Sequence, residues 1–167
     1  MYDRPNVYDR RIAFIQAYWH KDIVDQAREP IMAQIENHGL STGRVDFYEV
    51  PGGLEIPLLA KRLAGTGRYA IIAAAGLIVD GGIYRHDFVA GAIIDAMMRI
   101  QLDSEVPIIS AMLTPERFHD HPDHKRFFHD HFKVKGAGGP PPAPRRWQTW
   151  WRFRRLIPQR ESRVAMC

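Results

Sequence analysis

The chain has 167 residues, of which 46% are hydrophobic and 25% are charged, a composition typical of one globular domain with a full core. No apolar run reaches the roughly 18 residues of a membrane span, and the single cysteine, Cys167, excludes an internal disulfide and favours a reducing cytoplasm. The net charge of +4 is uneven: positions 137–167 hold seven arginines and one acid, whereas positions 1–136 hold 16 basic and 18 acidic residues.

The first half of the chain alternates between strand and helix patterns. An apolar run at residues 11–17 predicts a buried strand, and helical spacing follows over about 22–38, with Pro30 as a kink or break and Gly39 as the C-cap. Residues 45–50 alternate as a second strand does, and a helix is expected over roughly 54–63.

The second half repeats this order. An apolar strand is expected at 69–79, a helix at about 86–101, a strand at 106–113, and a helix over 115–131 that is interrupted near Pro122. Strands that alternate with helices predict a four-stranded parallel sheet in a three-layer α/β/α sandwich.

The composition changes after Gly136. Residues 138–144 read GGPPPAP, and the Trp- and Arg-rich remainder has neither a helical nor a strand period. We therefore expect an α/β domain over 1–136 and a poorly ordered tail over 137–167. Because the tail is strongly basic, a module that binds nucleic acid or an anionic surface is one alternative function.

Candidate site residues follow the ends of predicted strands, where open α/β sheets bind ligands. Trp19 can stack on a flat heterocycle or fill the core, and the segment PGGLE at 51–55 can offer backbone N–H groups to an anion or simply connect two elements. After the third strand, Arg85 can orient an anion and His86 can exchange protons near neutral pH, unless both are surface residues.

A histidine-rich stretch offers a different interpretation. His119, His121, Asp123 and His124 follow the spacing of a zinc-dependent hydrolase site. The pattern comes after four α/β units, however, with only His129 and His131 beyond it as further ligands. A half-exposed helix whose His124 or Arg126 binds phosphate is the preferred interpretation, with no metal.

Two ordered motifs together resemble the 6,7-dimethyl-8-ribityllumazine synthase family of riboflavin biosynthesis, closest to its second, decamer-forming type. They are PGGLEIP at 51–57 and GLIVDGGIYRHDFV at 76–89, and the resemblance covers roughly residues 8–136. It implies a flavodoxin-like fold and a transferase that condenses 5-amino-6-(D-ribitylamino)uracil with 3,4-dihydroxy-2-butanone 4-phosphate, releasing phosphate and water, without a cofactor.

The resemblance also assigns residues. Trp19 falls where the family stacks an aromatic ring on the pyrimidine, and Ser110 falls where many members have a phenylalanine from the adjacent subunit. His124 takes the place of a phosphate-binding arginine, with Arg126 nearby. The segments that hold the pyrimidine correspond to Gly53, Leu54, Glu55, Leu77, Ile78 and Val79, and the contact region for the butanone phosphate corresponds to Gly82 and Ile83.

The sequence departs from the family pattern at one catalytic position. Arg85 stands where the family usually has its proton-transferring histidine, and His86 follows one place later. Because arginine stays protonated, it is a poor base. The resemblance further implies a homo-pentamer or a dimer of pentamers, with sites between subunits, residues 1–9 extending a neighbour's sheet, and no nucleic-acid or membrane partner.

Overall fold

The computed structural model describes residues 10–37, 39–80, 85–115, 118 and 121–136. Four parallel strands form one sheet in the order β2-β1-β3-β4. The strands are β1 (Arg11–Ala17), β2 (Val45–Val50), β3 (Tyr69–Leu77) and β4 (Ile108–Leu113). This order matches the first four strands of a flavodoxin-like sheet, as expected, and places the topological switch point between β1 and β3.

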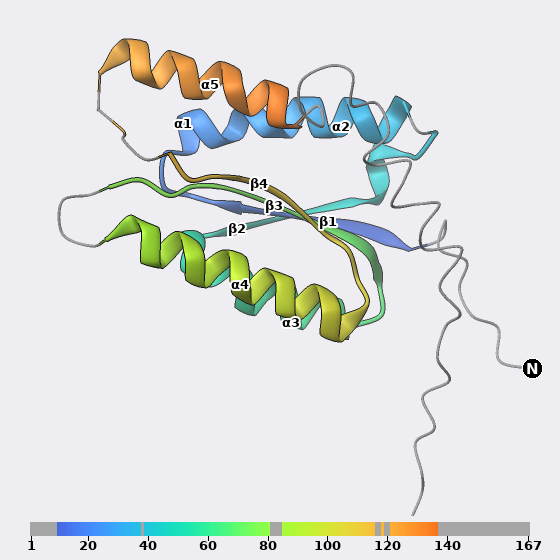
Figure 1. The fold of residues 1–167 in the computed structure, drawn as a ribbon. Helices are drawn as coiled ribbons and strands as arrows, with labels where there is room; N and C mark the ends of the chain where they lie inside the picture. The colour runs from blue at the N-terminus through green and yellow to red at the C-terminus, as the bar shows by residue number, and fades with distance from the viewer. Residues whose placement is uncertain (1–9, 38, 81–84, 116–117, 119–120, 137–167) are drawn as a thin grey trace, which may run out of the picture.

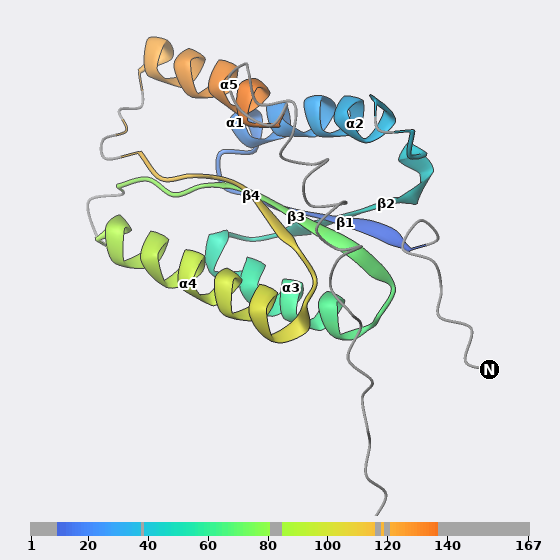
Figure 2. The same ribbon diagram turned by 45° about the vertical axis from the view of Figure 1, so that its right-hand side comes forward.

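Helices cover both faces of the sheet (Figures 1 and 2). One face carries α1 (Lys21–Val24), α2 (Arg28–Asn37) and α5 (Pro122–Gly136), and the other carries α3 (Ile56–Gly65) and α4 (His86–Ser104). Short 3-10 turns stand at η2 (Asp25–Ala27), η3 (Thr42–Arg44) and η4 (Gly53–Glu55). The three-layer sandwich is therefore confirmed.

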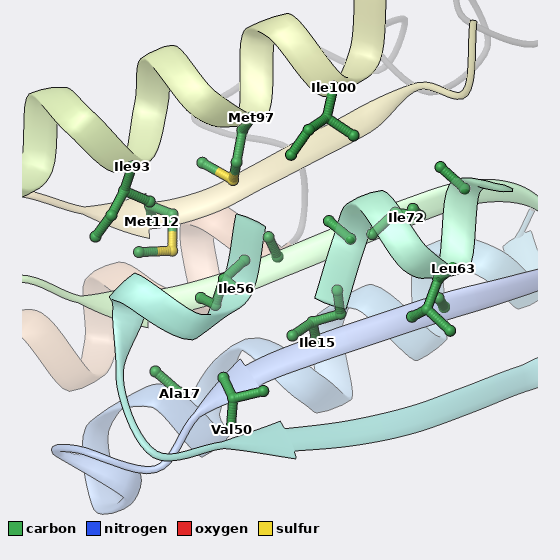
Figure 3. Packing of buried hydrophobic residues seen from close by; sticks show 14 of the residues in the cluster. Ile15, Ala17, Val50, Ile56, Leu63, Ile72, Ile93, Met97, Ile100 and Met112 are labelled. Carbon is green, nitrogen blue, oxygen red and sulfur yellow. The ribbon is translucent and has the colours of Figure 1, made fainter. Parts of the chain in front are cut away.

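The two cores follow the two-residue period of the strands. On β1, Ala13 and Ile15 face the α3–α4 layer, whereas Ile12 and Phe14 face the layer of α1, α2 and α5. Figure 3 shows the first cluster, in which Met97 of α4 packs above the sheet. Complete burial of one Val, Leu, Ile or Met side chain stabilises the fold by about 1.5–3 kcal/mol.

The first helical segment is broken, as predicted, but at residues 25–27, a few positions before Pro30. The turn η2 separates α1 from α2 and lies just before Pro30, whose missing N–H removes one helical hydrogen bond. Gly39, at φ 73°, donates to the Glu36 carbonyl at 2.8 Å, and the Leu40 N–H donates to the Ile35 carbonyl at 3.1 Å. This pair of bonds is a Schellman C-cap, so the glycine cap is confirmed.

The prediction for the last helix was wrong. The helix does not span 115–131: among the described residues it begins at Pro122 and continues to Gly136. A proline is favourable at the first helical position because the first-turn N–H groups have no helical partner. Pro122 therefore starts the helix and does not interrupt it.

The fourth strand is also shorter than predicted. It begins at Ile108 because Pro107, which has no N–H to give, contributes only its carbonyl, to the Ile72 N–H at 2.9 Å. The third strand ends at Leu77, two residues earlier than expected. Residues 137–167 lie outside the described residues, so the expected tail is not tested. Within the described ranges, no helix is both long and apolar enough to cross a membrane.

Candidate active site

The loop after β1 presents Trp19 to solvent on a fixed backbone. The Tyr18 N–H donates to the Val50 carbonyl at 2.8 Å, and the His20 carbonyl accepts from the N–H groups of Ile23 and Val24, both at 2.9 Å. Trp19 is 71% exposed, so it is not a core residue. An indole held in this way outside the core has its faces available to stack on a planar ligand.

The turn after β2 lies against the end of β3. A Cβ added to Gly53 would lie 2.4 Å from Cδ1 of Ile78 and 2.9 Å from Cδ1 of Ile93, so only glycine fits without rearrangement. The Gly52 N–H donates to the Glu55 carboxylate at 2.9 Å, which fixes the turn in the manner of a capping box. Leu54 projects outward and is 61% exposed.

The end of β3 supplies the opposite wall of this edge. Leu77 and Ile78 are buried, Val79 is half-buried and Asp80 is exposed. The Ile78 N–H donates to the Leu113 carbonyl at 2.9 Å, which ties the segment to β4. Gly82 and Ile83, the expected contacts of the butanone phosphate, lie outside the described residues.

Arg85 and His86 stand at the start of α4. Arg85 is the N-cap residue, and its Nη2 donates to Oδ2 of Asp87 at 2.8 Å. Its guanidinium carbon lies 4.1 Å from the centre of the Phe88 ring. The hydrogen bond from Arg85 lowers the pKa of Asp87, so the carboxylate is charged at neutral pH. His86 is half-buried in the first turn.

The two expected phosphate-binding residues lie in the first two turns of α5. The His124 ring meets the Phe128 ring edge-on, with centroids 6.1 Å apart, and Arg126 is exposed. Phe118 connects this helix to the Trp19 loop, because its ring lies 5.6 Å from that of Phe128 and 5.2 Å from that of His20.

Ser110 stands apart from the other candidates. It lies in β4 opposite Ala74, three positions before the strand ends at Leu113, and its Oγ accepts from the Met112 N–H at 3.2 Å. At about 3.3 Å per residue, this places it roughly 10 Å back from the carboxyl edge. Within one chain, Ser110 therefore lies away from the carboxyl edge at which Trp19 and Gly53 stand.

The carboxyl edge of the sheet brings the segments that carry the other described candidates close to one another. Strand register places Ala17 beside Val50 and Leu77 beside Leu113, so the segments that follow these strands emerge side by side. Sequence analysis assigned no role to His20, whose backbone adopts the left-handed conformation at φ 55°. A non-glycine residue in that region is uncommon, but no sequence signal could have found it.

The zinc interpretation gains no support from the described residues. Among them, no three His, Cys, Asp or Glu side chains are grouped so that they could hold a metal ion. The Nδ1 atom of His121 is 3.6 Å from the Asp123 carboxylate, which is a local contact at the start of α5. His119 and Asp120 lie outside the described residues.

The fold is that of a flavodoxin-like α/β protein, a class that binds ligands at the carboxyl edge of its sheet. At that edge this chain carries an exposed indole, a glycine turn and the start of a helix with Arg85 and His86.

Comparison with known proteins identifies the family. A family model described as 6,7-dimethyl-8-ribityllumazine synthase matches residues 9–138. A relative of that name from Rhodococcus erythropolis is 58% identical over 131 residues, which cover 78% of this chain and 84% of the relative. A 6,7-dimethyl-8-ribityllumazine synthase 2 from Pseudomonas syringae pv. tomato is 54% identical over 128 residues, 77% of this chain and 75% of the relative. The chain belongs to the 6,7-dimethyl-8-ribityllumazine synthase family.

Proposed function

We propose that the protein is a transferase that condenses 5-amino-6-(D-ribitylamino)uracil with 3,4-dihydroxy-2-butanone 4-phosphate to 6,7-dimethyl-8-ribityllumazine, with release of phosphate and water. Family membership and the names of its relatives support this reaction. The observation that carries it to this chain is the exposed Trp19 indole on a fixed loop beside the glycine turn at Gly53.

The reaction joins an amine to a ketone, forms an imine, expels phosphate, closes the ring and loses water. Trp19 stacks on the pyrimidine, while the backbone of Gly53 and Leu54 on one side and of Ile78 and Val79 on the other hold its edges. Because the two reactants must meet in one orientation, much of the acceleration comes from holding them together. None of these steps uses a redox cofactor or a metal.

Orientation of the anionic substrate and proton transfer are assigned to two neighbouring residues, Arg85 and His86. Arg85 stays protonated and orients the anionic substrate. His86, half-buried in the first turn of α4, is the group that exchanges protons, with Gly82 and Ile83 contacting the same substrate. His124 and Arg126 bind the phosphate and stabilise its departure as an anion.

We further propose assembly into a homo-pentamer or a dimer of pentamers, and the apolar outer face of α4 supports self-association. Ile94, Met98 and Leu102 lie four residues apart and are 37%, 49% and 70% exposed, although the inner face of the same helix is also apolar. A helix that is apolar on both faces is typical of an element buried on both sides. An adjoining groove of about 590 Å³ between α3 and α4 includes Leu58 and Ile100.

The cellular setting and domain limits complete the proposal. The enzyme acts in the cytoplasm on small-molecule substrates, with no nucleic acid or membrane as partner. Residues 1–136 form the catalytic domain, and residues 137–167 lie outside it. Static light scattering measures the assembly: Met98→Glu should reduce its mass, because a charge cannot be buried there without a partner.

The catalytic proposal is tested by mixing the purified protein with the two substrates and following lumazine absorbance. Trp19→Ala should raise the KM for the pyrimidine about tenfold or more, because base stacking on an aromatic ring contributes roughly 1–3 kcal/mol. Trp19→Phe, which keeps a ring, should retain most of the activity. No product from an assembled wild-type protein would refute the assignment.

A further inference from the structure

Three side chains at the start of α4 form a bracket that no folding requirement explains. Nη2 of Arg85 donates to Asp87 at 2.8 Å, and the guanidinium carbon lies 4.1 Å from the centre of the Phe88 ring. The side chains of Arg85 and Asp87 are 70% and 53% exposed, and Phe88 is 64% exposed. Exposed ion pairs contribute little to stability. A phenylalanine ring that stays largely in solvent adds little hydrophobic stabilisation.

A structural role explains only one member of the bracket. A carboxylate in the first helical turn is favourable next to the positive end of the helix dipole, which accounts for Asp87. It does not account for Phe88, which leaves its ring in solvent, or for Arg85, whose positive charge stands at the unfavourable end. The arrangement of the three therefore points to a ligand.

The bracket fixes the plane of the guanidinium. Asp87 holds one nitrogen from the side, and the Phe88 ring covers one face. Arginine has five N–H donors in a fixed fork, and among the described contacts only Nη2 is engaged by Asp87. The remaining donors keep a defined direction in which a phosphate can be bound by two parallel hydrogen bonds.

We propose that Asp87 and Phe88 are positioning residues that hold Arg85 as the group orienting the phosphate-bearing substrate. This proposal rests on the role given to Arg85 above and extends it. It assigns the position at which the family usually has a histidine to anion orientation, with Asp87 and Phe88 as the residues that make an arginine effective there. Asp87 and Phe88 act through Arg85 and do not touch the substrate.

A double-mutant cycle in the full-length, assembled protein tests this mechanism. Asp87→Asn should raise the KM for 3,4-dihydroxy-2-butanone 4-phosphate about threefold to tenfold, because the amide oxygen can still accept from Arg85 but lacks the charge that strengthens this hydrogen bond. The KM for the pyrimidine should stay the same. In an Arg85→Met background, Asp87→Asn should have no further effect, because the group that it positions is gone. Asp87→Glu should recover part of the loss.

The role of Phe88 is tested with the same KM measurement. Phe88→Leu should raise the same KM a few-fold, whereas Phe88→Tyr, which keeps the ring, should not. Asp95→Asn is the matched control, since Asp95 is another exposed carboxylate on α4 and should leave both KM values unchanged. Competition by inorganic phosphate gives a second readout that reports anion binding alone: its inhibition constant should rise in Asp87→Asn as the KM does.

Two failures can be told apart. If Arg85→Met leaves the KM for the butanone phosphate unchanged while Trp19→Ala impairs the reaction, the role of Arg85 is wrong and the bracket with it, but the proposed function stands. If Asp87→Asn has the same effect with and without Arg85, Asp87 does not act through the guanidinium and the positioning role is refuted. A fall in melting temperature with unchanged KM values would show that Asp87 serves only the helix.

Discussion

Gly53 is the residue at which the fold and the proposed site depend most directly on one missing side chain. Gly53→Ala adds a Cβ 2.4 Å from Cδ1 of Ile78, whereas carbon atoms in contact normally stay about 3.5–4.0 Å apart. The two Cδ1 atoms that would have to shift belong to Ile78 and Ile93, which are 9% and 1% exposed and so have little room to rotate. Overpacking of this kind costs about 1–3 kcal/mol, and we expect a loss of unfolding free energy within that range.

The same substitution should impair binding. If the turn moves by about 1 Å to relieve the clash, Leu54 and the backbone that holds the pyrimidine move with it. Displacements of that size can reduce activity about 100-fold, so kcat/KM for the pyrimidine should fall by at least about tenfold.

Urea denaturation and steady-state kinetics measure the two effects. Gly65→Ala, in the following helix, is the control: no heavy atom lies within 4 Å of its added Cβ, and we expect a gain of about 0.5–1 kcal/mol. Gly53→Ala combined with Ile78→Val, which removes Cδ1, should recover part of the lost stability. A Gly53→Ala protein with wild-type stability and wild-type kcat/KM would contradict the reasoning, because it would mean that this contact does not fix the turn.

Three further predictions concern the rest of the chain. Tyr69→Phe should lower the unfolding free energy by about 1–2 kcal/mol in urea titrations, because the buried Tyr69 hydroxyl joins Asp46 at 2.9 Å and Tyr48 at 2.6 Å. The hydrogen bond from Arg11 lowers the pKa of Asp46 below its ordinary 3.8. The ionised Asp46 therefore stabilises the fold fully above pH 3.8, and this stabilisation is lost as the pH falls through the lower folded-state pKa. Arg11→Gln should make the melting temperature depend less on pH in this acidic range. Truncation after Gly136 should preserve turnover and assembly, and a loss of both would show that the tail belongs to the catalytic unit.

Much of the fold could be predicted because its signals are local. Residues 11–17 were placed with the correct bounds because a central parallel strand needs a continuous apolar run, and residues 45–50 because an edge strand alternates between apolar and polar residues. Gly39 marked a helix end because a left-handed residue is needed there. Pro122 could not be interpreted in the same way, since a proline that starts a helix and one that interrupts it look alike until the preceding residues are placed.

The site was predictable in its location but not in its contacts. Topology alone brings the ends of β1, β2 and β3 to one edge, so Trp19 and Gly53 could be grouped from the sequence. The crowding at Gly53 depends on Ile93, 40 positions later, and glycines in sequence suggest flexibility, not lack of space. The contact between Arg85 and the Phe88 ring depends on side-chain rotamers, which no spacing rule specifies.

Ser110 is the residue whose position argues that one chain does not hold a complete site. β4 is the last strand of the described sheet on its side, and Ser110 lies within it, not at its carboxyl end. A side chain roughly 10 Å back from the carboxyl edge is beyond contact distance of a group bound at that edge. The family resemblance gives this position to the site of an adjacent subunit, and the place of Ser110 within β4 is compatible with that proposal. The apolar outer face of α4, next to which a neighbour would pack, supports the same assembly. Ser110→Arg should thus reduce activity and assembly together, and a variant that assembles normally but loses activity would place Ser110 at a neighbour's site without a part in the interface itself.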